Sequence, residues 1–351
     1  MSFLSFKDDE LDIMCRVINK LQICYHHIYA PMGKFTFRDV LELQNEMKNV
    51  TIIVDKNLVS PICEIAKNGF LKEELRLRKV AMFVTWAKYL NARLTCGMGI
   101  LETDTSEICT ISGEEERLQF LHGVDQIPVS IWKEIAFGYR DSVPNMFLYR
   151  QTVVESKNYK LNDNFLLLSN EVAIIKIVQL VRVPNMSAID KFINFMEWYT
   201  DNLAIAESIM TYAACVFANI PNVSLPKNAR SKEYQKVVKG IKNQAWDITY
   251  IVAWSIQFRN EEDGNYCMFA TDDITQKIIV VNIIPQGQCA DTLHAIFSTN
   301  SQYKKLMQLS DSKLGNARVH PFEKMEMEEK VCKVKELVNK EYSILQEMCQ
   351  G

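Results

Sequence analysis

Helical periodicity covers most of this chain and leaves room for only a small sheet. Apolar residues recur at intervals of three or four, as in helices with one buried face, over segments 9–29, 36–48, 71–93 and 232–258. Two short apolar runs, residues 50–54 and 267–270, depart from this pattern and indicate strands. The sequence therefore predicts a mainly helical α/β protein with few strands.

The remaining segments complete a helix-rich pattern. A helix is expected over 58–68 and ends at Asn68-Gly69, which resembles a C-cap. Segment 104–225 is expected to be helical with loops at 110–116, 140–146 and 156–164. Residues 274–284 fit a helix or a strand, and the tail 322–348 fits an amphipathic helix with roughly heptad spacing.

The domain organisation follows from the absence of a Pro-, Gly- or Ser-rich linker. This absence favours one core over two independent domains. We expect a domain over 1–321 and a separate amphipathic helix over 322–351. Within that domain the expected parts are N-terminal helices at 9–48, core segments at about 48–104 and 232–320, and a helical insertion at about 105–231.

Composition excludes several classes of protein. The chain is 48% hydrophobic with a net charge of −3, so it is a globular protein without a global positive field. Its ten cysteines are scattered without a C-x-x-C pair, which favours free thiols in a reducing cytoplasm. The N-terminus lacks a signal-peptide pattern, and stretches 165–184 and 203–220 are interrupted by charges, so we expect core helices and no membrane partner.

Acidic residues follow both predicted strands. Asp55 comes directly after the first run, and Asp272 and Asp273 follow the second. If the two strands are parallel, these carboxylates meet at the carboxyl edge of the sheet, where α/β proteins place their sites. The alternative is that each aspartate only caps the helix that follows it.

The long helix at 232–258 carries another acid and a basic face. Asp247 adjoins the apolar stripe of this helix, so a buried or half-buried carboxylate there needs a partner. Lys242 or Arg259 could provide one through a salt bridge, and a metal ion is the alternative. Lysines on the helix could contact phosphates, or could form an ordinary solvated face, and these are Lys232, Lys236, Lys239 and Lys242.

These residues together resemble a PIN-like domain. That family has an aspartate at the end of its first strand, matched here by Asp55 and the polar Asn57 after it. A later helix carries an acid, matched by Asp247, and the next strand ends in a T-x-D-like signature, matched by Thr271 and Asp273. The resemblance covers 48–104 and 232–284.

The family's remaining acid comes from a helix in the middle of the domain. Glu102 in the sequence GMGILE is the best match, with Asp104, Glu107 and Glu115 as alternatives. A large helical block separates Glu102 from Asp247, where small family members have a short connection. The resemblance implies a PIN-like small parallel sheet surrounded by helices, with a large helical insertion.

The resemblance implies a metal-dependent nuclease, an endoribonuclease that hydrolyses phosphodiester bonds of RNA or single-stranded nucleic acid with an activated water. Clustered carboxylates repel one another unless a cation balances them, and hard oxygen ligands select Mg²⁺ or Mn²⁺. The expected ligands are Asp55, Glu102, Asp247, Asp272 and Asp273. Asn57 and Thr271 are expected to orient them.

Two other classes of protein remain open. A haloacid-dehalogenase-like phosphatase also has a nucleophilic aspartate after a strand, but it needs a second aspartate where this chain has Asn57. A non-catalytic helical interaction protein would use helices 9–29 and 322–348 to bind partners. Helix 322–348 could also mediate a homo-oligomer or bind an inhibitory protein. The histidines, His26 and His27 among them, are expected to be structural or superficial.

Overall fold

The structure is a computed structural model that describes residues 8–45, 49–103, 111–151, 164–262, 264–284, 288–314 and 322–350. The chain forms two compact units. Unit 1 comprises residues 1–161 and 254–273, and unit 2 comprises residues 162–253 and 274–351. The helical insertion predicted at 105–231 and the separate helix predicted at 322–351 stay predictions.

Unit 1 contains a four-stranded mixed sheet, which confirms the α/β prediction in its general form. The strand order is β1-β4-β2-β3, and β1 alone is antiparallel to its neighbour. The strands are β1 (Cys24–Tyr25), β2 (Asn49–Val54), β3 (Arg93–Thr95) and β4 (Asn265–Ala270). The two predicted runs are therefore strands, and they pair in parallel.

The pairing of β2 with β4 has no offset at either end. Asn49 lies opposite Asn265, and Val54 lies opposite Ala270. The last four residues of β4 are buried, as are the last three of β2, because helices cover the sheet. Both strands consequently end at the same level of the sheet.

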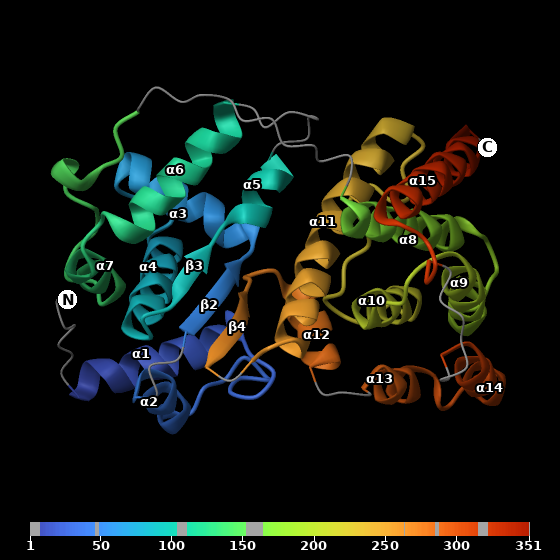
Figure 1. Ribbon diagram of the computed structural model, residues 1–351, viewed down its shortest axis with the longest axis horizontal. Coiled ribbons are helices and arrows are strands. Elements are labelled where there is room, and N and C mark those ends of the chain that lie inside the picture. The colour runs from blue at the N-terminus through green and yellow to red at the C-terminus, as the bar shows by residue number, and fades with distance from the viewer. Residues whose placement is uncertain are drawn as a thin grey trace. The chain divides into compact units, whose positions relative to one another are not determined.

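Seven helices accompany this sheet within the described part of unit 1 (Figure 1). They are α1 (Asp8–Leu21), α2 (Phe37–Asn45), α3 (Lys56–Asn68), α4 (Glu74–Tyr89), α5 (Gly97–Thr103), α6 (Ile111–Asp125) and α7 (Val129–Ala136). Helix α3 ends as predicted, since Gly69 adopts a left-handed φ of 84° and its N–H donates to the Ile65 carbonyl. Helix α4 packs on α1, α3, α7 and β3.

Three sequence predictions were wrong in this unit. The helix expected over 9–29 stops at Leu21, because Gln22 has a φ of 46° and the following residues pair with β4 as strand β1. The helix expected over 71–93 ends at Tyr89, and β3 follows it. The loop expected at 110–116 belongs to α6 from Ile111 onward.

All regular secondary structure in the described residues of unit 2 is helical. Its helices are α8 (Phe165–Arg182), α9 (Ala188–Asn202), α10 (Glu207–Phe217), α12 (Ile274–Ile283), α13 (Gln288–Phe297), α14 (Tyr303–Leu314) and α15 (Met327–Gln350). Helix α11 (Tyr234–Arg259) begins in this unit and ends in unit 1. The ambiguous segment 274–284 is therefore a helix, apart from its last residue. The predicted loop at 156–164 lies outside the described residues except for Asn164, which caps α8.

Helix α15 packs along α8, as Figure 1 shows. The Tyr342 hydroxyl donates to Glu171 at 2.6 Å, and the Gln179 amide donates to the Glu341 carbonyl at 2.9 Å. The heptad positions Val331, Val334, Val338 and Leu345 are buried. The apolar face that was considered for a partner is thus occupied within unit 2.

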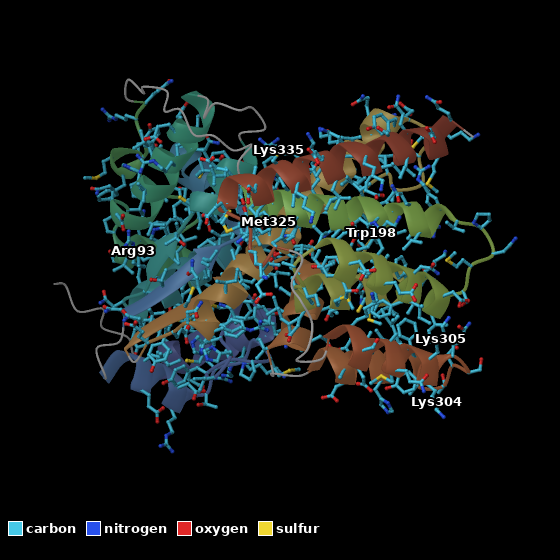
Figure 2. All side chains as sticks on the ribbon, turned by 45° about the vertical axis from the view of Figure 1, so that its right-hand side comes forward. Arg93, Trp198, Lys304, Lys305, Met325 and Lys335 are labelled. Carbon is cyan, nitrogen blue, oxygen red and sulfur yellow. The ribbon has the colours of Figure 1, made fainter. Side chains whose placement is uncertain are left out.

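Charged and aromatic side chains lie on the helices of unit 2. Lys304 and Lys305 project outward from α14, and Trp198 lies on α9 (Figure 2). The Lys176 ammonium lies 5.3 Å from the centre of the Trp198 ring. No helix in the described parts of the chain is long and apolar enough to cross a membrane.

The eight cysteines whose side chains the structure describes are free, as predicted. They are Cys15, Cys24, Cys63, Cys96, Cys215, Cys267, Cys332 and Cys349, of which all but Cys15 and Cys332 are buried. Cys109 and the side chain of Cys289 lie outside the description.

The backbone of Lys227 passes directly over position 240 of α11, and this close approach requires glycine there. A Cβ atom at position 240 would meet the Lys227 carbonyl oxygen at 1.8 Å. We expect Gly240→Ala to lower the free energy of unfolding by about 2 kcal/mol or more, although alanine normally stabilises a helix interior by about 1 kcal/mol. Thermal unfolding followed by circular dichroism measures this difference. Gly97→Ala is the control, since nothing lies within 4 Å of its Cβ position, and equal stability of both variants would contradict the close approach.

Candidate functional site

The ends of β2 and β4 bring the predicted acids of unit 1 together. The backbone N–H of Asp55 donates to the Ala270 carbonyl at 2.9 Å, which extends the ladder by one bond beyond the strands. Thr271, Asp272 and Asp273 follow Ala270 directly. These residues therefore lie together at the carboxyl edge of the sheet, as the sequence predicted.

A hydrogen-bond network joins the two strand ends. The Thr271 hydroxyl donates to Asp55 Oδ2 at 2.8 Å, and the Asn57 amide donates to the same oxygen. The Asn57 Oδ1 atom accepts from the Asp272 N–H at 3.0 Å, and the Thr271 hydroxyl accepts from the Asp273 N–H at 3.0 Å. Asn57 and Thr271, which were predicted to orient the site, thus hold the Asp55 carboxylate and the backbone at Asp272 and Asp273.

The capping alternative does not describe Asp55. Asp55 occupies the N-cap position of α3, and its carbonyl accepts from the N–H groups of Leu58 and Val59 at 2.9 and 3.0 Å. Its side chain makes no capping hydrogen bond. The carboxylate is directed instead toward Thr271 and Asn57.

Burial and neighbouring charges raise the proton affinity of Asp55. Asp55 is only 1% exposed. This burial raises the pKa of Asp55 to about 7, the hydroxyl of Thr271 opposes the rise, and the negative charges of Glu102 and Asp273 add to it. Glu102, on α5, and Asp273 are therefore near enough to act on Asp55, as the clustering prediction requires.

Asp272 lies beside a basic side chain. Its carboxylate forms an ion pair with Lys79 of α4. The Lys56 ammonium pairs in turn with Glu116 of α6. Sequence reasoning did not identify Lys79 or Lys56, because 193 residues separate Lys79 from Asp272 and no local pattern links them.

The other predicted site residues belong to unit 2. Asp247 is half-buried, and its Oδ1 atom accepts a hydrogen bond from the buried amide of Gln276 at 3.0 Å. The four predicted phosphate contacts, Lys232, Lys236, Lys239 and Lys242, are exposed on α11. Lys236 pairs with Glu233 at 2.6 Å. The roles of Asp247 and the lysines stay predictions.

The acids at the strand ends have the oxygen ligands that a hard cation prefers. Asp55, Glu102 and Asp273 offer only oxygen atoms, and their mutual repulsion is relieved by a proton or by a cation. Their oxygens are spaced more widely than those of a compact preformed site. Among the described residues, one group has three ligand atoms within 4.8 Å of one another, and it consists of His26, His27 and Glu261.

Comparison of this chain with protein-family models, with curated proteins and with solved structures finds no match.

The raised pKa of Asp55 makes stability depend on pH. Between about pH 4 and pH 7 the folded protein holds a proton on Asp55 that the unfolded chain has lost, so this group lowers the free energy of unfolding as pH rises through that window. A shift of about three pKa units corresponds to about 4 kcal/mol. In a chelator, Asp55→Asn should therefore gain stability relative to the wild type as pH rises.

Chemical denaturation at a series of pH values measures this effect. The control is Asp125→Asn, whose carboxylate is exposed and pairs with Lys88 at 3.0 Å. Parallel pH profiles for the wild type and Asp55→Asn would show that Asp55 titrates normally.

Proposed function

We propose that this protein is a metal-dependent nuclease with a PIN-like fold, an endoribonuclease that hydrolyses phosphodiester bonds in RNA. One observation supports the proposal above all others. Asp55 and Asp273 follow adjacent parallel strands that end at the same level, and Glu102 acts on the same carboxylate. A carboxyl edge with several acids is the arrangement on which this class of chemistry depends.

Asp55, Glu102 and Asp273 would hold Mg²⁺ or Mn²⁺. A bound ion would supply the positive charge that balances these carboxylates, stabilises the phosphate and lowers the pKa of water. The ion pair with Lys79 neutralises Asp272. This ion pair weakens the attraction of Asp272 for a cation.

The other residues of the network hold the carboxylates in place. Thr271 is fully buried, and its hydroxyl both donates to Asp55 and accepts from the Asp273 backbone. Asn57 links the start of α3 to the turn at Asp272. These bonds fix Asp55 relative to Asp273 before a ligand arrives, which lowers the cost of organising the site.

The resemblance to the family also assigns a metal-binding role to Asp247, and Lys232, Lys236, Lys239 and Lys242 would contact the phosphates of single-stranded RNA. These roles rest on the resemblance to the family and on the exposure of the lysines. Phosphate contacts of this kind position a nucleic acid and carry little sequence information. A cytoplasmic location is part of the same proposal and rests on the free cysteines.

Metal binding gives the first test. If Mn²⁺ binds the folded protein and not the unfolded chain, a tenfold excess over Kd raises the free energy of unfolding by about 1.4 kcal/mol. We expect a rise in melting temperature with Mn²⁺ for the wild type and for Asp125→Asn, and none for Asp55→Asn. An unchanged melting temperature at millimolar metal would favour a non-catalytic interaction protein.

Cleavage gives the second test. The purified protein is incubated with Mn²⁺ and labelled single-stranded RNA or DNA of the same sequence. We expect RNA cleavage that falls by about 100-fold or more in Asp55→Asn and Asp273→Asn, a loss of about 2.7 kcal/mol of transition-state stabilisation. Asp125→Asn should cleave like the wild type. Cleavage that survives both site substitutions would refute the assignment.

A further inference from the structure

Two adjacent histidines and a glutamate meet at the opposite end of β4 from the acids. His26 and His27 follow β1, and Glu261 lies between α11 and β4. His26 Nε2 lies 3.3 Å from Glu261 Oε1, and His27 Nδ1 lies 3.5 Å from Glu261 Oε2. The helix predicted over 9–29 would point these two side chains in different directions. They meet because α1 ends at Leu21.

The histidine pair is enclosed by aromatic side chains. His27 stacks on Phe258 with ring centres 4.8 Å apart, and Tyr266 meets His26 edge-on at 5.4 Å. The side chain of His26 is fully buried, and those of His27 and Glu261 are 22% and 10% exposed. The three groups thus face one another in a mainly apolar setting.

His27 presents a buried nitrogen that lacks a hydrogen bond. Its Nδ1 atom has no hydrogen-bond partner among the residues that the structure describes. A buried polar atom without a hydrogen-bond partner points to a missing ligand.

We propose that His26, His27 and Glu261 bind one divalent transition-metal ion. Two imidazoles and a carboxylate are a donor set that Zn²⁺ accepts, and Zn²⁺ imposes no geometric preference of its own. Their ligand atoms already lie within 4.8 Å of one another. Nitrogen donors distinguish this site from the oxygen-only set at Asp55, so each can exist without the other.

Metal binding rearranges the hydrogen bonds of His26. In the metal-free ring, Nδ1 accepts from the N–H groups of Ile28 and Tyr29, both at 3.2 Å, so the ring proton resides on Nε2 and faces Glu261. Coordination through Nε2 requires the other neutral tautomer, with the ring proton on Nδ1, so the bonds from the Ile28 and Tyr29 N–H groups are given up. Two hydrogen bonds of this length are weak beside metal–ligand bonds.

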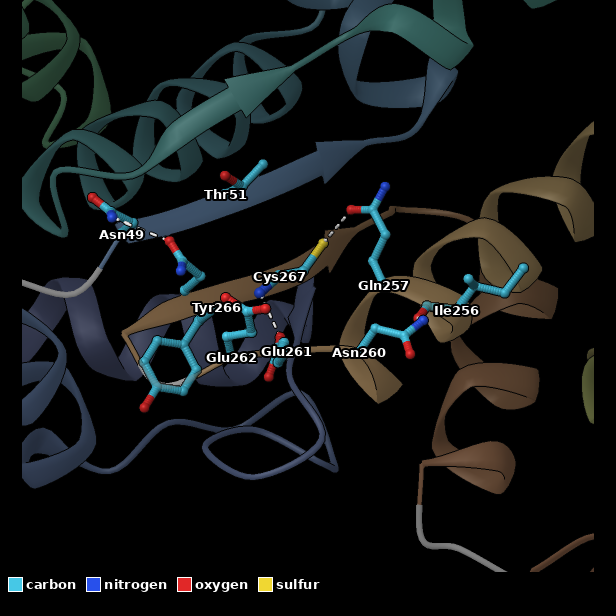
Figure 3. Close-up of a pocket in the computed structure, with 10 residues that line it drawn as sticks. Asn49, Thr51, Ile256, Gln257, Asn260, Glu261, Glu262, Tyr266 and Cys267 are labelled. Carbon is cyan, nitrogen blue, oxygen red and sulfur yellow. Dashed lines mark hydrogen bonds between the residues drawn. The ribbon is translucent and has the colours of Figure 1, made fainter.

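A pocket adjoins one ligand of the proposed site. Glu261 lines a cavity of about 390 Å³ together with Gln257, Asn260, Tyr266 and Cys267 (Figure 3). Its Oε1 atom also accepts from the Cys267 N–H, which fixes the carboxylate at the cavity wall. Three protein ligands would leave a four-coordinate ion one further position for water or for an oxygen or nitrogen donor.

Titration with Zn²⁺ and Co²⁺ tests the proposal. The protein is stripped with a chelator and titrated in excess Mg²⁺ by calorimetry and, with Co²⁺, by absorption spectroscopy. We expect one equivalent to bind, with affinity reduced by roughly 100-fold in Glu261→Gln and in His27→Phe, which keeps the stacking on Phe258. Glu262→Gln, the neighbouring exposed acid, and Asp55→Asn should bind like the wild type.

Measurements on the wild type keep the test decisive if a variant fails to fold. The bound Co²⁺ spectrum should lack intense thiolate charge-transfer bands, and the amide resonances of Ile28 and Tyr29 should shift on Zn²⁺ binding. The proposal is overturned if the wild type binds no Zn²⁺, if both site variants bind as tightly as it does, or if the spectrum shows cysteine ligands. If the wild type binds Zn²⁺ but does not cleave RNA, the nuclease proposal is refuted and the metal site is not.

Discussion

The parallel pairing of β2 with β4 is the interaction on which the rest of unit 1 depends. Six residue pairs run in register from Asn49 opposite Asn265 to Val54 opposite Ala270, although the two strands lie more than two hundred positions apart in the chain. Because parallel neighbours have their carboxyl ends on one side, the residues after each strand must meet. The bond from the Asp55 N–H to the Ala270 carbonyl fixes the level at which they do so.

This pairing also explains why Asp55 is tolerated in the core. A lone buried carboxylate is costly, and burial moves the pKa of Asp55 to about 7. Thr271 and Asn57 compensate in part, since both donate to the same oxygen. Glu102 and Asp273 work in the opposite direction. The repulsion among these three acids is the physical reason for the cation that we propose.

The sequence predicted the parts of this fold whose signals are local. The runs at 50–54 and 267–270, the turn at Gly69 and the acids after both strands are visible within a few residues. Strands β1 and β3 have two and three residues, and their extended conformation comes from pairing with β4 and β2, so no local pattern distinguishes them from the helices beside them. The same limit hid the pairing of Lys79 with Asp272 and the meeting of His26 and His27 with Glu261. Each of these depends on segments that only the folded sheet brings together.

We propose that the acids at the ends of β2 and β4 hold a divalent metal. Crystals grown with Mn²⁺ test it most directly, through an anomalous difference map recorded at the manganese absorption edge. The proposal predicts a peak bonded to the carboxylates of Asp55 and Asp273. A map with no peak there, or with manganese bound solely at other acids, would contradict it.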